Sequence, residues 1–144
     1  MFKRLIAFLK VFIFLLREFI FYISNATAVY SKYKIFLLPS QQIDSIENIS
    51  LAVNFSMGKN CKLLARAIDA SISIEENVKL NHNVMINADF GGKITISENV
   101  IIGPNTVFRA SDHKVSPDKL YTKSGHVAGE IYISNNVWIG SNVV

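Results

Sequence analysis

Residues 74–106 read IEENVKLNHNVMINADFGGKITISENVIIGPNT and repeat a six-residue pattern. Each block has an aliphatic residue, an Asn or Asp three positions later, and a Val, Thr or Phe directly after that. The blocks, two of which lie further along the chain, begin at Ile74, Leu80, Ile86, Ile96, Ile102, Ile133 and Ile139, and their fourth residues are Asn77, Asn83, Asp89, Asn99, Asn105, Asn136 and Asn142. Such a period fits neither a helix nor an alternating strand, so it indicates short strands separated by regular corners. Because Asn and Asp tolerate the left-handed backbone of a corner, the sequence predicts an all-β solenoid.

The N-terminal segment, residues 1–29, is predicted to be an amphipathic helix outside the solenoid. It holds most of the apolar excess behind the mean hydropathy of +0.29, yet Lys3, Lys10 and Arg17 recur every seven residues and form one stripe on a helix. A helix spanning a bilayer would place Lys10, Arg17 and Glu18 in its core, at up to ~2.5 to 3.5 kcal/mol each. We therefore expect the helix to lie in the plane of an anionic inner leaflet. Packing on its own solenoid or on partner chains, and a single transmembrane span, are the alternatives.

The predicted domain organisation places a linker at residues 30–48, which contain Pro39, and a solenoid at residues 49–144. Two irregularities interrupt the repeat. Gly91 and Gly92 accompany a shortened block, and a polar excursion separates Phe108 from Val127. Excursions from a rigid scaffold often display functional residues, so we expect such residues between Phe108 and Val127.

Charge and cysteine content argue against several classes of protein. The formal net charge is only +4 and the basic residues are scattered outside the N-terminal segment, so no nucleic-acid partner is expected. Cys61 is the single cysteine, which excludes an internal disulfide and is interpreted as a small buried hydrophobe. The spacing of His82, His113 and His126 matches no compact ligand motif, so no metal is expected.

Residues 74–144 resemble the hexapeptide-repeat acyltransferases, particularly the galactoside, maltose and capsular-polysaccharide O-acetyltransferases. Three segments carry this resemblance: ISENVIIGPNTVFRASDH, GHVAGEIYI and NNVWIGSNVV. The resemblance implies a left-handed parallel β-helix, a homotrimer with active sites between subunits, and acetyl-CoA as the acyl donor. It also implies further coils beyond Val144, so the sequence is expected to be truncated or a fragment, and its activity alone is uncertain.

The resemblance implies that His113, in SDHKVSP, is the general base. An imidazole can accept the proton of a sugar hydroxyl near neutral pH as that hydroxyl attacks a thioester carbonyl. A loop histidine with no catalytic role is the alternative. His126 is expected to have a structural role.

Four further residues match positions of the same family. Asn81 and Asp89 match residues that meet the acceptor sugar, although Asp89 is also interpretable as an ordinary corner residue. Trp138 matches an aromatic residue beside the acetyl-CoA tunnel, and Ser141 matches a hydrogen-bond donor to the thioester oxygen. Outward packing for Trp138 and an ordinary polar site for Ser141 remain open.

These observations predict an acetyl-CoA-dependent O-acetyltransferase of a sugar hydroxyl. The expected setting is cell-surface polysaccharide biosynthesis, in the cytoplasm or at the inner face of the cytoplasmic membrane. An amino-sugar N-acetyltransferase and a non-catalytic solenoid that binds a membrane or a partner chain are the alternatives.

Overall fold

The computed structural model describes residues 2–144, which divide into two compact units, one ending at Pro39 and the other beginning at Ser40. The first unit is dominated by one helix, α1 (Phe2–Tyr33), and the second is a parallel β-solenoid. The solenoid unit begins within the stretch expected to be a linker, because β1 (Gln42–Asp44) and the 3₁₀ helix η1 (Ile46–Asn48) already belong to its first coil. The hexad pattern does not extend to these residues, so the sequence placed the start of the solenoid at Ile49, one strand too late.

Helix α1 is long because residues 2–33 contain neither Gly nor Pro. It ends where Lys34 adopts a left-handed backbone with φ of 59° and donates its N–H to the Tyr30 carbonyl at 2.8 Å. The segment after the helix returns to it, and the Tyr22 hydroxyl donates to the Leu37 carbonyl at 2.8 Å. Among the described residues, no helix combines the length and apolarity needed to cross a membrane.

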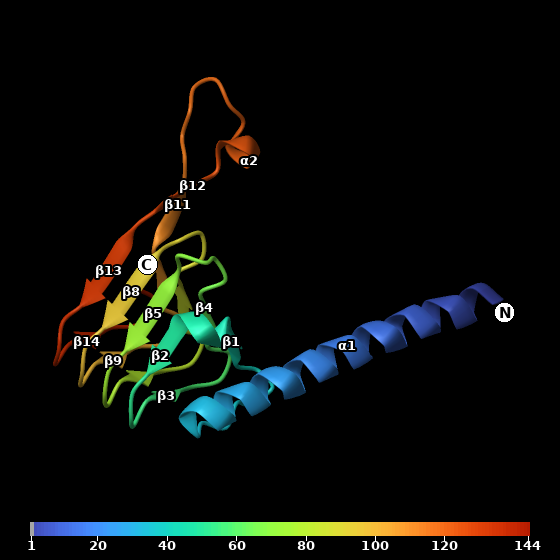
Figure 1. Ribbon diagram of the computed structural model, residues 1–144, viewed down its shortest axis with the longest axis horizontal. Coiled ribbons are helices and arrows are strands. Elements are labelled where there is room, and N and C mark those ends of the chain that lie inside the picture. Colours follow the sequence, from blue (N-terminus) through green and yellow to red (C-terminus); the bar gives the residue numbers. More distant parts are fainter. Residues whose placement is uncertain (1) are drawn as a thin grey trace. The chain divides into compact units, whose positions relative to one another are not determined.

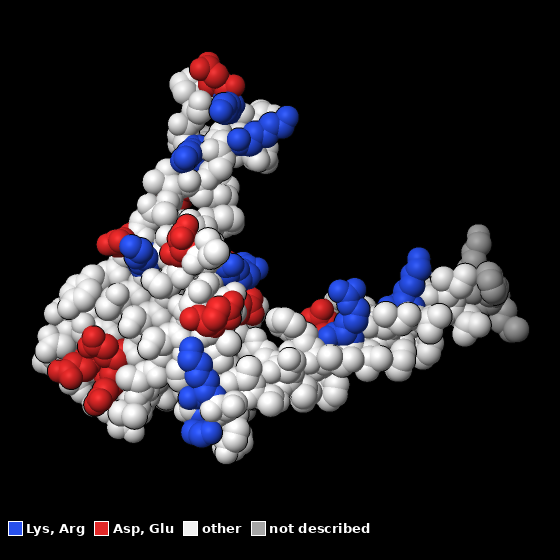
Figure 2. All heavy atoms as spheres, viewed as in Figure 1, with Lys and Arg blue, Asp and Glu red and all other residues white. Residues whose placement is uncertain are grey.

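Most large apolar side chains of α1 are exposed: Leu5, Ile6, Phe8, Leu9, Val11, Phe12, Ile13, Phe14, Leu15, Leu16, Phe19, Ile20, Phe21, Ile23 and Tyr30. In the view of Figure 2, basic side chains and an acidic one interrupt the uncharged surface of the helix. The expected basic stripe includes Lys10 and Arg17, both exposed, whereas the side chain of Lys3 lies outside the described part of the chain. Val29, near the end of the helix, is buried, but most of the apolar surface formed by the described residues of α1 is exposed.

The solenoid has three faces, each a four-stranded parallel sheet (Figure 1). The first face contains β1, β4 (Lys62–Leu64), β7 (Met85–Asn87) and β10 (Val107–Arg109). The second contains β2 (Ile49–Leu51), β5 (Ser71–Ile74), β8 (Lys93–Ile96) and β13 (Glu130–Ile133). The third contains β3 (Ser56–Met57), β6 (Lys79–Leu80), β9 (Ile101–Ile102) and β14 (Trp138–Ile139). The chain passes through the three faces in turn and completes four coils.

The core consists of aliphatic residues stacked in register from coil to coil. On the second face Leu51, Ile74, Ile96 and Ile133 form one such column, and all four are buried. Cys61 is also fully buried, and burial raises the pKa of its thiol. The predicted fold class, an all-β solenoid of the left-handed parallel β-helix type with an N-terminal α-helix, is confirmed.

Asparagine forms most of the predicted corners. Six of the seven predicted corner residues adopt positive φ, namely Asn77, Asn83, Asn99, Asn105, Asn136 and Asn142. Asp89 does not, and Phe90 (φ 65°) and Gly91 (φ 85°) turn the chain instead. The interpretation of Asp89 as an ordinary corner residue is therefore wrong, because the shortened block moves the turn past it. Asn54 and Asn60 also adopt positive φ, so the corners begin one coil before the clean repeat.

Candidate functional site

The polar excursion leaves the solenoid as a hairpin between the first and second faces (Figure 1). Its outgoing strand β11 (Ser111–His113) pairs antiparallel with its returning strand β12 (His126–Ala128), and a short helix, α2 (Tyr121–Ser124), lies between them. The predicted base, His113, is the last residue of β11. Its backbone N–H donates to Asp112 Oδ1 at 2.7 Å, so the strand end that carries it is held by a local hydrogen bond.

The hairpin register places a second histidine opposite the first. His113 pairs with His126, and their ring centroids are 4.2 Å apart at an interplanar angle of 39°. The other face of the His126 ring stacks on Phe90, with centroids 3.6 Å apart and planes only 4° from parallel. Phe90, His126 and His113 therefore form a continuous aromatic stack at this corner. The sequence did not reveal it, because Phe90 and His113 are 36 and 13 residues away from their common partner His126 and meet it only through the hairpin register.

The electrostatic surroundings favour the neutral form of His126. Partial desolvation lowers the pKa of this imidazole, and the neighbouring His113 and Arg109 lower it further, whereas Asp112 acts in the opposite direction. His126 therefore stays uncharged at neutral pH beside the predicted base.

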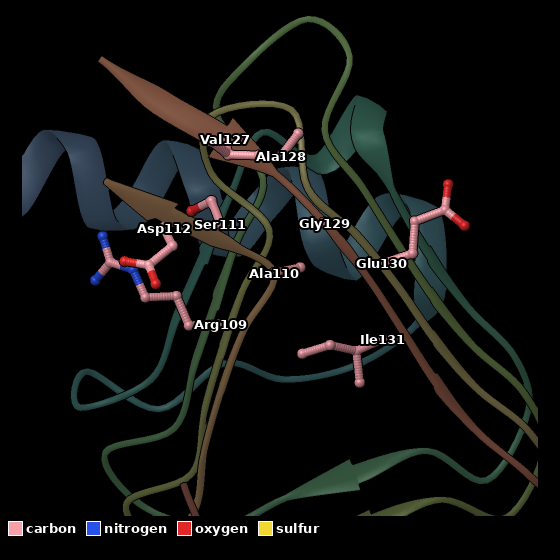
Figure 3. Close-up of a pocket in the computed structure, with 9 residues that line it drawn as sticks. All are labelled: Arg109, Ala110, Ser111, Asp112, Val127, Ala128, Gly129, Glu130 and Ile131. Atoms are coloured by element: carbon pink, nitrogen blue, oxygen red, sulfur yellow. The ribbon is translucent and has the colours of Figure 1, made fainter. Parts of the chain in front are cut away.

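A pocket of about 290 Å³ lies at the base of the hairpin (Figure 3). Residues 109–112 and 127–131 line it, and they include the charged side chains Arg109, Asp112 and Glu130. The Ser111 hydroxyl is buried, and no residue in the described part of the chain hydrogen-bonds to it. His113 directly follows this lining segment on β11, so hydroxyl, carboxylate and imidazole groups are available within one short stretch.

Asp89 lies at the same corner but is already engaged. Its carboxylate is 4% exposed, and it accepts hydrogen bonds from the Arg66 backbone N–H at 2.8 Å and from Arg66 Nε at 3.0 Å. Burial raises the pKa of this carboxyl, but the bonds from Arg66 outweigh that effect and leave the pKa below its ordinary value. In this structure Asp89 ties one coil to the next, and its contact with an acceptor sugar remains a prediction.

The other three predicted residues lie elsewhere on the prism. Asn81 and Ser141 are exposed at the corner between the third and first faces, where the Asn81 side chain accepts the backbone N–H of His82. Trp138 stands on β14 of the third face and is 80% exposed. One chain therefore does not bring Asn81, Trp138 and Ser141 together with His113 and Asp89, and their roles remain predictions.

Among residues 2–144, no group of three His, Cys, Asp or Glu side chains is arranged to hold a metal ion. His113 and His126 are close, but Asp112, the nearest acid in the sequence, is bonded to the backbone of His113. The site as built offers imidazole, hydroxyl and guanidinium groups for acid–base and hydrogen-bond chemistry.

Comparison with known proteins gives two relatives. The chain is 38% identical over 76 residues to the galactoside O-acetyltransferase of Escherichia coli K12, a match covering 52% of this chain and 36% of that protein. It is 26% identical over 110 residues to the galactoside O-acetyltransferase of Lactococcus lactis subsp. lactis IL1403, covering 74% of this chain and 50% of that protein. The chain thus spans half or less of the length of these curated relatives. No family model matches it, and no solved structure matches it significantly.

The fold and the relatives agree on the class of protein. Four coils of hexapeptide-type repeats with asparagine corners define a three-sided parallel β-helix, and both relatives are sugar acetyltransferases by name. The predicted resemblance to the hexapeptide-repeat O-acetyltransferases is confirmed.

Proposed function

We propose that this chain belongs to an O-acetyltransferase that transfers an acetyl group from acetyl-CoA to a sugar hydroxyl. The observation that carries the proposal is the similarity to two galactoside O-acetyltransferases from different bacteria, over a region folded as hexapeptide coils. The position of His113 on a hairpin beside a polar pocket supports it.

His113 is proposed as the general base. Its imidazole accepts the proton of the sugar hydroxyl while the hydroxyl oxygen attacks the acetyl carbonyl carbon of acetyl-CoA. The resulting tetrahedral intermediate expels the thiolate of CoA, which takes the proton back from the imidazolium as the ester product leaves. Such base catalysis typically contributes ~10²- to 10⁴-fold to the rate. The buried Ser111 hydroxyl and Arg109 are available to bind acceptor hydroxyls in the adjacent pocket.

A homotrimer with sites between subunits is part of the proposal. The proposed sugar-contacting and donor-contacting residues Asn81, Trp138 and Ser141 lie away from the corner that carries His113. A site that uses all of them needs a second copy, whose third face and adjoining corner approach the hairpin of the first.

We also propose that the enzyme acts in cell-surface polysaccharide biosynthesis at the inner face of the membrane. The exposed apolar surface of α1, with its basic residues Lys10 and Arg17, supports peripheral contact with an anionic leaflet. An acceptor handled at the membrane surface would then be presented to a catalytic solenoid held nearby.

Acetyl transfer from acetyl-CoA to a panel of glycosides, including galactosides, tests the activity. We expect transfer by the chain to fall about a hundredfold or more in His113→Ala, while Lys119→Ala, a substitution on the same excursion, retains it. Calorimetry with acetyl-CoA gives an independent measure of donor binding. Absence of both transfer and acetyl-CoA binding would favour a non-catalytic solenoid, and equal rates with and without His113 would remove it as the base.

A further inference from the structure

The stack at the hairpin base suits His126 to a more specific role than that of a structural residue in a turn. Its ring lies between two other rings, Phe90 on one face and His113 on the other. Phe90 is itself fixed, because it occupies the left-handed corner of its coil next to Asp89, whose carboxylate is bonded to Arg66. A series of contacts therefore connects the rigid coil, through Phe90 and His126, to the imidazole of His113.

We propose that His126 is a positioning residue, which orients the His113 imidazole by holding it against a ring that Phe90 clamps to the solenoid. The proposal rests on the proposed function in so far as His113 is the base. Catalysis by a base requires its nitrogen to lie within hydrogen-bond reach of the acceptor hydroxyl, so a ring free to rotate at the end of a two-stranded hairpin would be less effective.

The charged groups around His126 fit this role. His113 and Asp112 face it from β11, and Arg109 faces it from the end of β10, while Asp89 on the Phe90 corner is turned to Arg66. His113 and Arg109 both disfavour a proton on His126, and Asp112 offsets them only in part. A neutral His126 does not oppose the positive charge that His113 acquires when it accepts a proton, whereas a protonated one would.

The decisive experiment is NMR of the histidine rings in the 144-residue chain and two variants. His126→Phe keeps a flat ring against Phe90, and His126→Ala removes it. We expect the His113 ring resonances to stay close to their wild-type positions in His126→Phe and to move toward those of a solvated histidine in His126→Ala. His82, which lies at another corner, provides an internal reference.

A reciprocal titration tests the contact from the other side. Since the neighbouring His113 lowers the pKa of His126, His113→Phe should raise the titration midpoint of His126. Unchanged His113 resonances in His126→Ala, or an unchanged His126 midpoint in His113→Phe, would overturn the proposal. Should His126→Ala fail to fold, Phe90→Ala takes its place, since it removes the clamp and should displace both histidine resonances.

Kinetics separate this proposal from the proposed function. With measurable transfer, His126→Ala should lower kcat about tenfold or more with little change in KM, and His126→Phe should restore most of the loss. Ring resonances that behave as expected in a chain without transfer would contradict the proposed function alone. Transfer that depends on His113 but is identical in both His126 variants would contradict the positioning role alone.

Discussion

The corner asparagines stabilise the solenoid through both their backbone and their side chains. In each of two corners the amide side chains hydrogen-bond from coil to coil, from Asn54 through Asn77 to Asn99, and from Asn60 through Asn83 to Asn105. The donor–acceptor distances are 2.9 to 3.1 Å, so each amide has an ordered partner although it is exposed. Asn is therefore favoured over Gly at these corners, because Gly supplies the left-handed backbone without the bonds.

Asn83 lies in the middle of one row of hydrogen-bonded Asn side chains. Its substitution therefore separates the stabilisation by the side-chain bonds from the tolerance of a left-handed backbone. Asn83→Gly keeps the left-handed backbone but loses both side-chain bonds, while Asn83→Ala loses the bonds and adds backbone strain at φ of 58°. Such strain costs roughly 1 to 2 kcal/mol for an ordinary residue. Urea unfolding followed by circular dichroism should rank the wild type above Asn83→Gly, and Asn83→Gly above Asn83→Ala. Asn83→Ala at least as stable as the glycine variant would contradict this account.

The Asp89–Arg66 pair predicts a pH dependence of stability. The pKa of Asp89 is below its ordinary 3.8 in the folded chain, so the carboxylate stabilises the fold at pH values above 3.8. This stabilisation is lost as the pH falls through the folded pKa. Asp89→Asn should lower the free energy of unfolding at pH 7 by about 1 to 3 kcal/mol, because the buried carboxylate is replaced by a neutral amide that pairs less well with the Arg66 donors.

The difference in the free energy of unfolding between Asp89→Asn and the wild type should shrink as the pH is lowered below about 4. Urea titrations at pH 7 and below pH 4 measure it, with Asp118→Asn, an exposed acid on the excursion, as the control. A difference that stays constant across this range would contradict the role of the ionised carboxylate. Arg66 is 59% exposed on its side chain, so solvent screening keeps the expected effect modest.

At the scale of elements, the sequence predicted the repeated strands and corners but missed the contacts between residues that are far apart in the chain. The hexads located β5 to β9 and the asparagine corners between them, since each block is one short strand and one turn. The start of the first coil was missed because β1 and η1 lack the full pattern, whereas β2 lies at the predicted start of the solenoid, and Asn54 and Asn60 already occupy corners. The excursion was recognised by its polarity and by His113. The stack of Phe90, His126 and His113 could not be predicted, because it depends on a hairpin register and on a corner shifted by one residue from Asp89.

Gly92 is required because its coil lies very close to Ala110, in the next coil, at the base of the hairpin. A methyl group at this position would lie 2.4 Å from the Ala110 carbonyl oxygen and 2.8 Å from its Cβ. The Ala110 carbonyl cannot easily move, since it accepts the Gly129 N–H at 2.8 Å at the base of the hairpin. Gly92→Ala should therefore destabilise the chain by about 1 to 3 kcal/mol.

The matched control for Gly92→Ala is Gly140→Ala, because a methyl group there would meet nothing within 4 Å. Thermal unfolding of both variants gives the comparison. Equal melting temperatures would show that the neighbouring coils adjust freely around Gly92. A selective loss for Gly92→Ala would show that the base of the hairpin is rigid, as the positioning of His113 requires.

At the scale of the whole molecule, the two units differ in how their apolar residues are used. The solenoid buries its aliphatic columns, whereas α1 leaves both faces apolar and exposed. Leu9, Phe12, Leu16 and Phe19 alternate at spacings of three and four and form one stripe. Phe14 and Phe21 follow Lys10 and Arg17 by one helical turn, so apolar rings also accompany the basic side. A water-exposed helical bundle would leave these rings exposed, whereas a lipid interface accommodates them while the basic side chains reach the headgroups.

Binding to lipid vesicles is the last prediction, and it follows from that distribution. The chain should cosediment with vesicles containing anionic phospholipid more strongly than with zwitterionic vesicles, and the difference should fall as salt is added. Each basic residue near an anionic surface contributes about 1 kcal/mol, so Lys10→Gln with Arg17→Gln should weaken binding by about 2 kcal/mol, or about thirtyfold. Glu18→Gln is the control, since removal of an acid from the same helix should leave binding equal or stronger. Equal binding to both kinds of vesicle would contradict this prediction. Burial of the apolar side chains of α1 in an oligomer formed without lipid would likewise assign the helix to protein packing.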